Sequence, residues 1–252
     1  MELEVIVLIC FFVFLAGMID SIAGGGGLIS LPTYIASGLP VHTALGCNKF
    51  SSTFGTMVAS VRFWKSKKVH IKTVVVSIVC ALIGSAAGAK TVLYVNDHII
   101  KIVLLIIIPI VVVFVALKKD FGLKNDADSL SQRQVMALTV IIGLGIGFYD
   151  GFMGPGTGTF LIFSYTIMLR FDLVTASGNA KLVNLASNIG ALITFLIHGQ
   201  VYFALAVPAA FSGILGNFIG SGLALKNGSK IIKPVFLGAL GLLILNLLYS
   251  VK

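Results

Sequence analysis

The stretch GMIDSIAGGGGLISLP at residues 17–32 returns in altered form as GFYDGFMGPGTGTFLI at residues 147–162. In each stretch an apolar segment that ends near one aspartate runs into a glycine-rich sequence, and a second apolar segment follows. Glycine runs and Gly-Pro-Gly continue a helix poorly. The sequence therefore predicts that a helix is interrupted twice, at related places in the two halves of the chain.

The composition around these stretches is that of a membrane protein. Of the 252 residues, 58% are hydrophobic and 11% are charged, and the mean hydropathy is +1.06. Soluble domains typically carry about 25% charged residues, so a soluble globule, a disordered chain and a secreted disulfide scaffold are all excluded. The net charge of +9 fits the Lys- and Arg-rich cytoplasmic loops of a membrane protein better than nucleic-acid binding.

Apolar runs long enough to form membrane helices, about 20 residues each, fill most of the first half. We predict an all-α polytopic membrane protein whose first segments lie at residues 5–22, 28–39, 43–64, 73–95 and 99–117. The second of these is shorter than the others. A charged cytoplasmic linker follows at residues 118–133.

The pattern of the first half begins again after this linker. An offset of 130 residues places Asp20 on Asp150, and an offset of 132 places Lys49 on Lys181. Two unrelated apolar helices would match in Leu and Ile, but not in Asp, Lys and Gly in the same order. We therefore predict two tandem homologous repeats of four to five membrane segments each, a construction common in secondary transporters, at residues 1–117 and 134–252.

The relative orientation of the repeats depends on the short segment at residues 28–39. If it crosses the membrane, the repeats are inverted, and if it enters and returns, they are parallel. The inverted arrangement places more of the Lys and Arg residues on the cytoplasmic side, which favours it. Twelve helical residues rise only about 18 Å, so the segment spans the membrane only if the glycine stretch adds length.

The glycine-rich breaks are candidates for anion binding. Irregular backbone inside a membrane is tolerated where protein or a water-filled cavity satisfies its polar groups, and the N–H groups that begin the next helix suit an anion. The alternative is close helix packing, which we expect for an ordinary pair such as Gly84 and Gly88. The predicted binding residues here are Gly24, Gly25, Gly26, Gly27, Gly154, Gly156 and Thr157.

Asp20 and Asp150 are the acidic residues of the two breaks. An ionisable group within a membrane segment costs at least about 2.5–3.5 kcal/mol to insert and usually has a functional role. We predict that one of these carboxylates carries a coupling proton or ion. The alternative is a structural one, in which each aspartate accepts hydrogen bonds from the backbone of the broken turn.

A polar stripe marks the third segment of each half. Spacings of three and seven residues put Lys49, Ser52 and Thr56 on one helical face. The equivalent face in the second half carries Lys181, Asn184 and Asn188. We predict that both stripes line a substrate pathway for a small anion. The alternative is that each lysine reaches the headgroups while the other side chains join helices.

The remaining polar residues indicate no metal, cofactor or enzymatic site. The four histidines share no ligand spacing, and the three cysteines lie in or beside apolar runs without metal-ligand or disulfide spacing. The run Gly24–Gly27 lacks the Lys-Ser or Lys-Thr that follows a phosphate-binding loop. We therefore expect neither an enzyme nor a bound cofactor. The histidines are His42, His70, His98 and His198.

These motifs resemble the paired signatures of the TauE/SafE sulfite-exporter family, and those of the second half are most similar to its YfcA-like members. The motifs are the two breaks, with TALGCNKFSSTFG at residues 43–55 and TASGNAKLVNLASNIG at residues 175–190. The family's Asn-Lys motif maps onto Asn48 and Lys49 and onto Asn179 and Lys181. Because Ala180 separates the second pair, the two half-sites are not chemically identical.

The resemblance covers nearly the whole chain and implies a multi-pass transporter of a bacterial or archaeal cytoplasmic membrane. We predict that it moves sulfite, an organosulfonate or a related small anion by alternating access, as an exporter. An anion-selective channel and a transporter of a non-sulfur organic anion stay open as alternatives. The expected partners are the small anion and the lipid bilayer, without nucleic acid, and assembly into a homo-oligomer also stays open.

Overall fold

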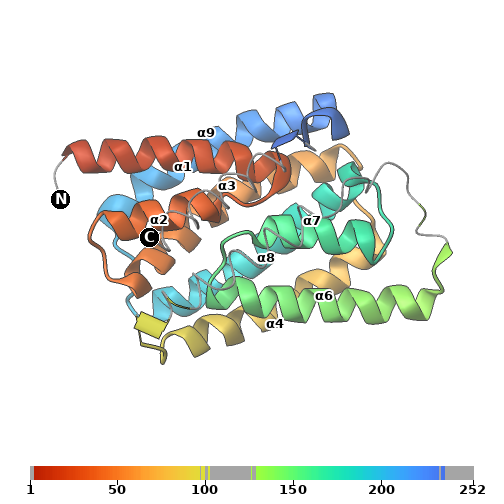
Figure 1. Ribbon diagram of the computed structural model, residues 1–252, viewed down its shortest axis with the longest axis horizontal. Coiled ribbons are helices and arrows are strands. Elements are labelled where there is room, and N and C mark those ends of the chain that lie inside the picture. Colours follow the sequence, from red (N-terminus) through yellow and green to blue (C-terminus); the bar gives the residue numbers. More distant parts are fainter. Residues whose placement is uncertain are drawn as a thin grey trace.

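The computed structural model describes residues 3–96, 98–99, 102, 126, 129–232 and 234–235. Every regular element in these residues is a helix, and none of them forms a strand (Figure 1). The all-α prediction is therefore confirmed for this part of the chain. The helices are α1 (Leu3–Ala23), α2 (Gly27–Ala36), α3 (Val41–Lys65), α4 (Ile71–Val92), α6 (Gln132–Phe152), α7 (Thr157–Ile167), α8 (Leu173–Ile197) and α9 (Phe203–Asn227).

Five of these helices, α1, α4, α6, α8 and α9, are long and apolar enough to cross a membrane. Large apolar side chains cover much of their outer surface, among them Phe11, Ile83 and Phe211, which are more than half exposed. Water solvates such a surface poorly, whereas lipid tails solvate it well. The protein is therefore a multi-pass membrane protein, as its composition predicts.

The helix α3 differs from these five in its polarity. It has the same length as α8, 25 residues, but it carries more polar side chains, and over half of its residues are buried. It packs against α8 and α9. The segment predicted at residues 43–64 is thus a helix, and it brings its polar face into the centre of the bundle.

The other predicted segments have different outcomes. Residues 5–22 and 73–95 correspond to α1 and α4, and the short segment predicted at residues 28–39 forms the ten-residue α2. The segment predicted at residues 99–117 and most of the linker at 118–133 lie outside the described residues. At the end of this linker α6 begins at Gln132, where Ser131 and Gln134 form a reciprocal capping box.

The helices α1 and α9 lie side by side and run in the same direction. A β-carbon at Gly216 would lie 2.1 Å from the carbonyl oxygen of Phe14, and one at Gly220 would lie 2.2 Å from that of Met18. Because the residue numbers of the contacting pairs rise together on both helices, the two helices are parallel. The glycines let the two backbones approach closely, because any side chain there would clash.

The helices α4 and α6 form a second parallel pair with the same kind of contact. A β-carbon at Gly84 would lie 2.5 Å from the carbonyl oxygen of Leu144, and one at Gly88 would lie 2.1 Å from that of Phe148. Gly84 and Gly88 therefore serve helix packing, as predicted.

The helix α3 runs in the same direction as α9, and therefore as α1. Gly55 of α3 lies against Gly213 of α9, and Arg62, further along α3, donates a hydrogen bond to the carbonyl oxygen of Phe218, further along α9. Because α1 and α3 point the same way, residues 24–40 between them must return through the depth of the bundle. The helical part of this return is α2.

The helices α3 and α8 cross in opposite directions at the centre of the bundle. Ser60 Oγ donates to the carbonyl oxygen of Lys181 at 2.9 Å, and Lys49 Nζ donates to Asn188 Oδ1 at 3.1 Å. A later residue of α3 thus meets an earlier residue of α8. This crossing brings the two predicted polar stripes together.

Candidate functional site

Both predicted helix breaks are present, and glycines form them. Gly24 and Gly25 follow α1 with φ of +78° and +88°, and Gly154 and Gly156 follow α6 with φ of +89° and +81°. Residues with a side chain rarely adopt this left-handed conformation, whereas glycine adopts it at little cost. The glycine-rich sequence therefore ends each helix within the bundle and starts a short one, α2 or α7.

The two breaks pack directly against each other. A β-carbon at Gly24 would lie 2.3 Å from the carbonyl carbon of Gly158 and from the backbone nitrogen of Thr159. Thr159 Oγ1 in turn donates to the carbonyl oxygen of Ala23 at 3.4 Å. Segments about 130 residues apart in the chain thus meet backbone to backbone, and only glycine at position 24 leaves room for this contact.

One lysine–aspartate pair lies at the end of α1. Lys181 Nζ is 3.7 Å from Asp20 Oδ2, and it also donates a hydrogen bond to the main-chain carbonyl oxygen of Asp20. Asp20 Oδ1 accepts a hydrogen bond from the Gly26 N–H at 3.1 Å. Asp20 therefore stabilises the broken turn, as the structural alternative predicts, and at the same time neutralises a lysine that is completely buried.

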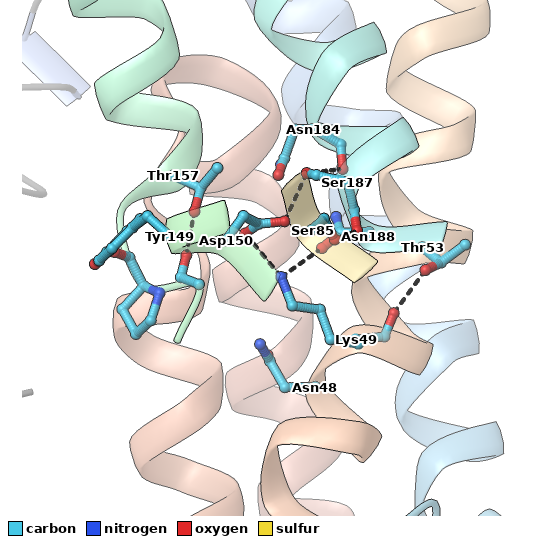
Figure 2. Close-up of polar contacts among 12 residues, drawn as sticks. Asn48, Lys49, Thr53, Ser85, Tyr149, Asp150, Thr157, Asn184, Ser187 and Asn188 are labelled. Carbon is cyan, nitrogen blue, oxygen red and sulfur yellow. Dashed lines mark hydrogen bonds and ion pairs between the residues drawn. The ribbon is translucent and has the colours of Figure 1, made fainter. Parts of the chain in front are cut away.

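A second lysine–aspartate pair lies at the end of α6 (Figure 2). Lys49 Nζ is 2.7 Å from Asp150 Oδ1, and both side chains are only 2% exposed. The ammonium also donates to Asn188 Oδ1 at 3.1 Å, and Ser187 Oγ donates to Asp150 Oδ2 at 2.6 Å. Removing one partner of such a buried pair leaves an uncompensated charge, which typically costs about 3–5 kcal/mol.

Each pair joins the two halves of the chain. Lys49 belongs to the first half and binds an aspartate of the second, and Lys181 belongs to the second half and binds an aspartate of the first. The sequence predicts a role for each lysine and each aspartate separately. That each lysine pairs with the aspartate of the other half depends on how α3 and α8 cross. No local sequence pattern indicates this pairing.

A polar cavity lies where the two breaks meet α3 and α8. Its volume is about 30 Å³, which is room for about two water molecules, so any ligand enclosed in this conformation must be small. Most of the predicted site residues contribute to its wall. These are Asp20, Gly25, Gly26, Gly27, Asn48, Lys49, Ser52, Thr56, Asp150, Gly154, Gly156, Thr157, Asn184 and Asn188.

Three predicted site residues lie outside this lining. Gly24 packs against Gly158, and Lys181 lies behind Asp20. Asn179 Oδ1 accepts a hydrogen bond from the backbone N–H of His70 at 3.0 Å. Asn48, the first-half partner of the same motif, does line the cavity, and it accepts a hydrogen bond from Ser30 Oγ at 2.6 Å.

Several polar residues of the site are absent from the sequence prediction. Ser187 holds Asp150, while Ser30, Ser51 and Asn217 line the cavity. Ser187 lies three residues after Asn184 on the same helical face, so extending the predicted stripe would have found it. Asn217 is an isolated amide in an apolar helix, and that is the only local signal it offers.

The chemistry of the wall suits a small polar ligand. Hydroxyl and amide side chains surround one ammonium group, Lys49, which Asp150 neutralises. In the part of the chain that the structure describes, no group of three or more His, Cys, Asp or Glu side chains is arranged to hold a metal ion. These side chains can bind and release a hydrogen-bonding molecule. They can also bind an ion, provided that a change in the charge of Lys49 or Asp150 compensates the charge of that ion.

Comparison with known proteins identifies relatives of this chain. The sequence model of the family described as "Sulfite exporter TauE/SafE" matches residues 9–247. The probable membrane transporter protein YfcA of Escherichia coli (strain K12) is 34% identical over 243 residues, which are 96% of this chain and 89% of that protein.

Two further relatives are also named as probable membrane transporter proteins. ORF9 of Sinorhizobium sp is 33% identical over 222 residues, covering 88% of this chain and 84% of the relative. A protein of Haemophilus influenzae is 31% identical over 223 residues, covering 88% and 86%. No solved structure matches this chain. On the family match and these long alignments, the chain belongs to the sulfite exporter TauE/SafE family.

Proposed function

We propose that this protein is a secondary transporter that exports a small anion, sulfite or an organosulfonate, across a bacterial cytoplasmic membrane. The observation that carries the proposal is the Lys49–Asp150 pair, buried in the membrane part of the protein and facing a polar cavity. Charged groups at such a depth usually mark a substrate or ion pathway. The family name and the bacterial relatives support the substrate class and the membrane.

The proposed ligands of the anion are donors from both halves of the chain. Lys49 supplies a positive charge, and the amide groups of Asn48, Asn184 and Asn188 and the hydroxyl groups of Ser52 and Thr56 supply hydrogen bonds. All of them line the same cavity. The backbone N–H groups at the start of α7 complete the set, because a helix N-terminus favours negative charge. Asp20 and Asp150 are the candidates for proton coupling.

We further propose that the chain consists of two inverted repeats, residues 1–117 and 134–252, joined by a cytoplasmic linker. The helix lengths support this, because α1 to α4 have 21, 10, 25 and 22 residues and α6 to α9 have 21, 11, 25 and 25. The packing also agrees with a repeat. If each helix is replaced by its counterpart in the other half, α1 by α6 and α9 by α4, the contact α1–α9 becomes the contact α6–α4, which is also present. Equivalent helices such as α3 and α8 run in opposite directions, which an inverted arrangement requires.

Alternating access would then arise from rocking of the halves about the cavity. The breaks meet largely through backbone atoms, with a side-chain hydrogen bond from Thr159 to Ala23, and we propose that one half moves against the other there. We expect the bilayer to be the main contact of the outer surface and no cofactor to be needed. A homo-oligomer is compatible with this arrangement.

Sulfite flux into proteoliposomes tests the proposal. The unaltered protein should carry labelled sulfite, and Lys49→Ala should reduce the flux by about 100-fold, because loss of a buried charged hydrogen-bond partner costs about 2–5 kcal/mol. Lys90→Ala removes a lysine at the exposed end of α4 and should leave the flux unchanged. Equal flux in Lys49→Ala and the unaltered protein would contradict the site, and single-channel currents would indicate the channel alternative.

A further inference from the structure

The two lysine–aspartate pairs differ in their access to the cavity. Lys49, Asp150 and Asp20 line the cavity, whereas Lys181 lies outside its lining. Lys181 is also tied to the main chain, since its ammonium donates to the carbonyl oxygen of Asp20. Lys49 is therefore the lysine that an ion in this cavity can reach.

The charges of these four groups add to zero when all of them are ionised. An anion that enters the cavity meets an ammonium that Asp150 already neutralises at 2.7 Å. The anion would add an uncompensated negative charge to a poorly solvated site, and such burial is strongly unfavourable. Anion binding at Lys49 therefore requires that the negative charge of Asp150 be removed or moved away.

A proton on Asp150 removes that charge without moving a helix. One proton from solution binds Asp150 Oδ1, the oxygen that faces Lys49, and the carboxyl group becomes neutral. No other covalent bond forms or breaks. The hydrogen bond from Lys49 to Oδ1 is replaced by one to the anion, and the proton returns to solution when the anion leaves. Lys49 keeps its positive charge and exchanges the carboxylate for the anion, so the site stays neutral overall.

Asp20 does not offer the same exchange. Asp20 Oδ1 accepts the hydrogen bond of the Gly26 N–H, and its ionic partner is Lys181. A proton on Asp20 would free a lysine that does not line the cavity. Elsewhere around Asp150, α7 carries no charged side chain, and the lysines of α4 lie at its exposed ends. These are Lys72 and Lys90.

We infer that binding of one anion at Lys49 is coupled to uptake of one proton by Asp150, so that the protein carries a monovalent anion and a proton together. This inference rests on the proposed transport function and specifies its coupling. Co-transport of the two is electroneutral, and its net direction follows the product of the proton and anion gradients. Export against an inward pH gradient therefore requires a larger outward anion gradient. By linkage, lower pH must strengthen anion binding to the same extent that the anion strengthens proton binding.

Titration calorimetry of the purified full-length protein tests the coupling. Ethanesulfonate is the first probe, because its sulfonate group takes up no proton near neutral pH, and sulfite is the second. Measurements in two buffers of different ionisation enthalpy give the number of protons taken up per bound anion. We expect about one proton, with affinity rising about tenfold for each pH unit lowered while free Asp150 is ionised.

The variant Asp150→Asn should bind ethanesulfonate without proton uptake and with an affinity that does not depend on pH. At pH 8 it should bind more tightly than the unaltered protein, since Lys49 then has no carboxylate partner. A merely structural loss would weaken binding instead. Asp172→Asn is the matched control, because Asp172 caps α8 through the N–H groups of Val174 and Thr175 and asparagine caps equally well.

The outcomes separate the coupling from the transport function. Anion binding without proton uptake, or uptake that persists in Asp150→Asn, would overturn the coupling and leave the transport proposal standing. Loss of uptake in Asp20→Asn, with Asp150→Asn unaffected, would also overturn it. If neither anion binds and neither is transported, the proposed function fails, and this inference fails with it. Thermal unfolding of each variant establishes that the protein measured is folded.

Discussion

Lys49–Asp150 and Lys181–Asp20 each combine a lysine of one half with an aspartate of the other half. Within the described residues, the ammonium of Lys49 binds the side chains of Asp150 and Asn188, and Lys49 lines the cavity. The ammonium of Lys181 is also held by a main-chain carbonyl, at the point where α1 breaks. A lysine held by side chains can exchange partners, whereas one held by main chain supports the backbone. We therefore assign binding to the first pair and structural support to the second.

The strongest test of this comparison replaces the two lysines in turn. Lys181→Ala should destabilise the protein by about 3–5 kcal/mol, because it leaves a carboxylate in the bundle without its cation. Its sulfite flux per folded molecule should fall by far less than the roughly 100-fold expected for Lys49→Ala. Thermal unfolding in detergent and flux normalised to folded protein give the two quantities. The assignment would be reversed if Lys181→Ala lost transport while keeping its stability.

A second comparison concerns the glycines of the two breaks. Gly24→Ala should destabilise the fold by about 3 kcal/mol or more, because it combines a left-handed φ with a β-carbon 2.3 Å from backbone atoms of the other break. Gly156→Ala has the same kind of φ, but its nearest neighbours are side-chain atoms at 3.8 Å, so about 1–2 kcal/mol is expected. Unfolding midpoints in detergent measure both. Equal losses of stability in the two variants would show that the left-handed φ alone determines the loss and that the contact between the breaks contributes nothing.

The smallest expected effect concerns the second partner of each lysine. Asn188→Ala removes a hydrogen bond to the Lys49 ammonium and should weaken sulfite binding about tenfold, since hydrogen bonds to charged groups contribute about 1.5–3 kcal/mol. Ser60→Ala removes the hydrogen bond to the Lys181 carbonyl and should cost about 1 kcal/mol of stability without changing affinity. Calorimetric titration and thermal unfolding distinguish the two. A Ser60→Ala protein with weakened sulfite binding would argue against separate roles.

Much of the site follows from patterns that are local in the sequence. The repeated Asp, Gly and Lys positions identify the breaks and the polar stripes, because glycine interrupts a helix wherever it occurs in a run and spacings of three and seven residues define a helical face. Ser187 was not predicted, although it extends the polar stripe of α8, and Asn217 was not predicted either. A serine in an apolar helix usually bonds to its own backbone, and a single asparagine forms no pattern.

The sequence by itself determined that this is a polytopic helical membrane protein with two glycine-broken helices, because composition and chain flexibility are local properties. It also identified the four charged residues that meet inside the bundle. Only the tertiary structure decided that each lysine binds the aspartate of the opposite half, and that Lys49 faces the cavity while Lys181 does not. Lys49 and Lys181 occupy equivalent positions in the proposed repeats, so their different surroundings arise only when α3 and α8 cross and the two breaks pack together.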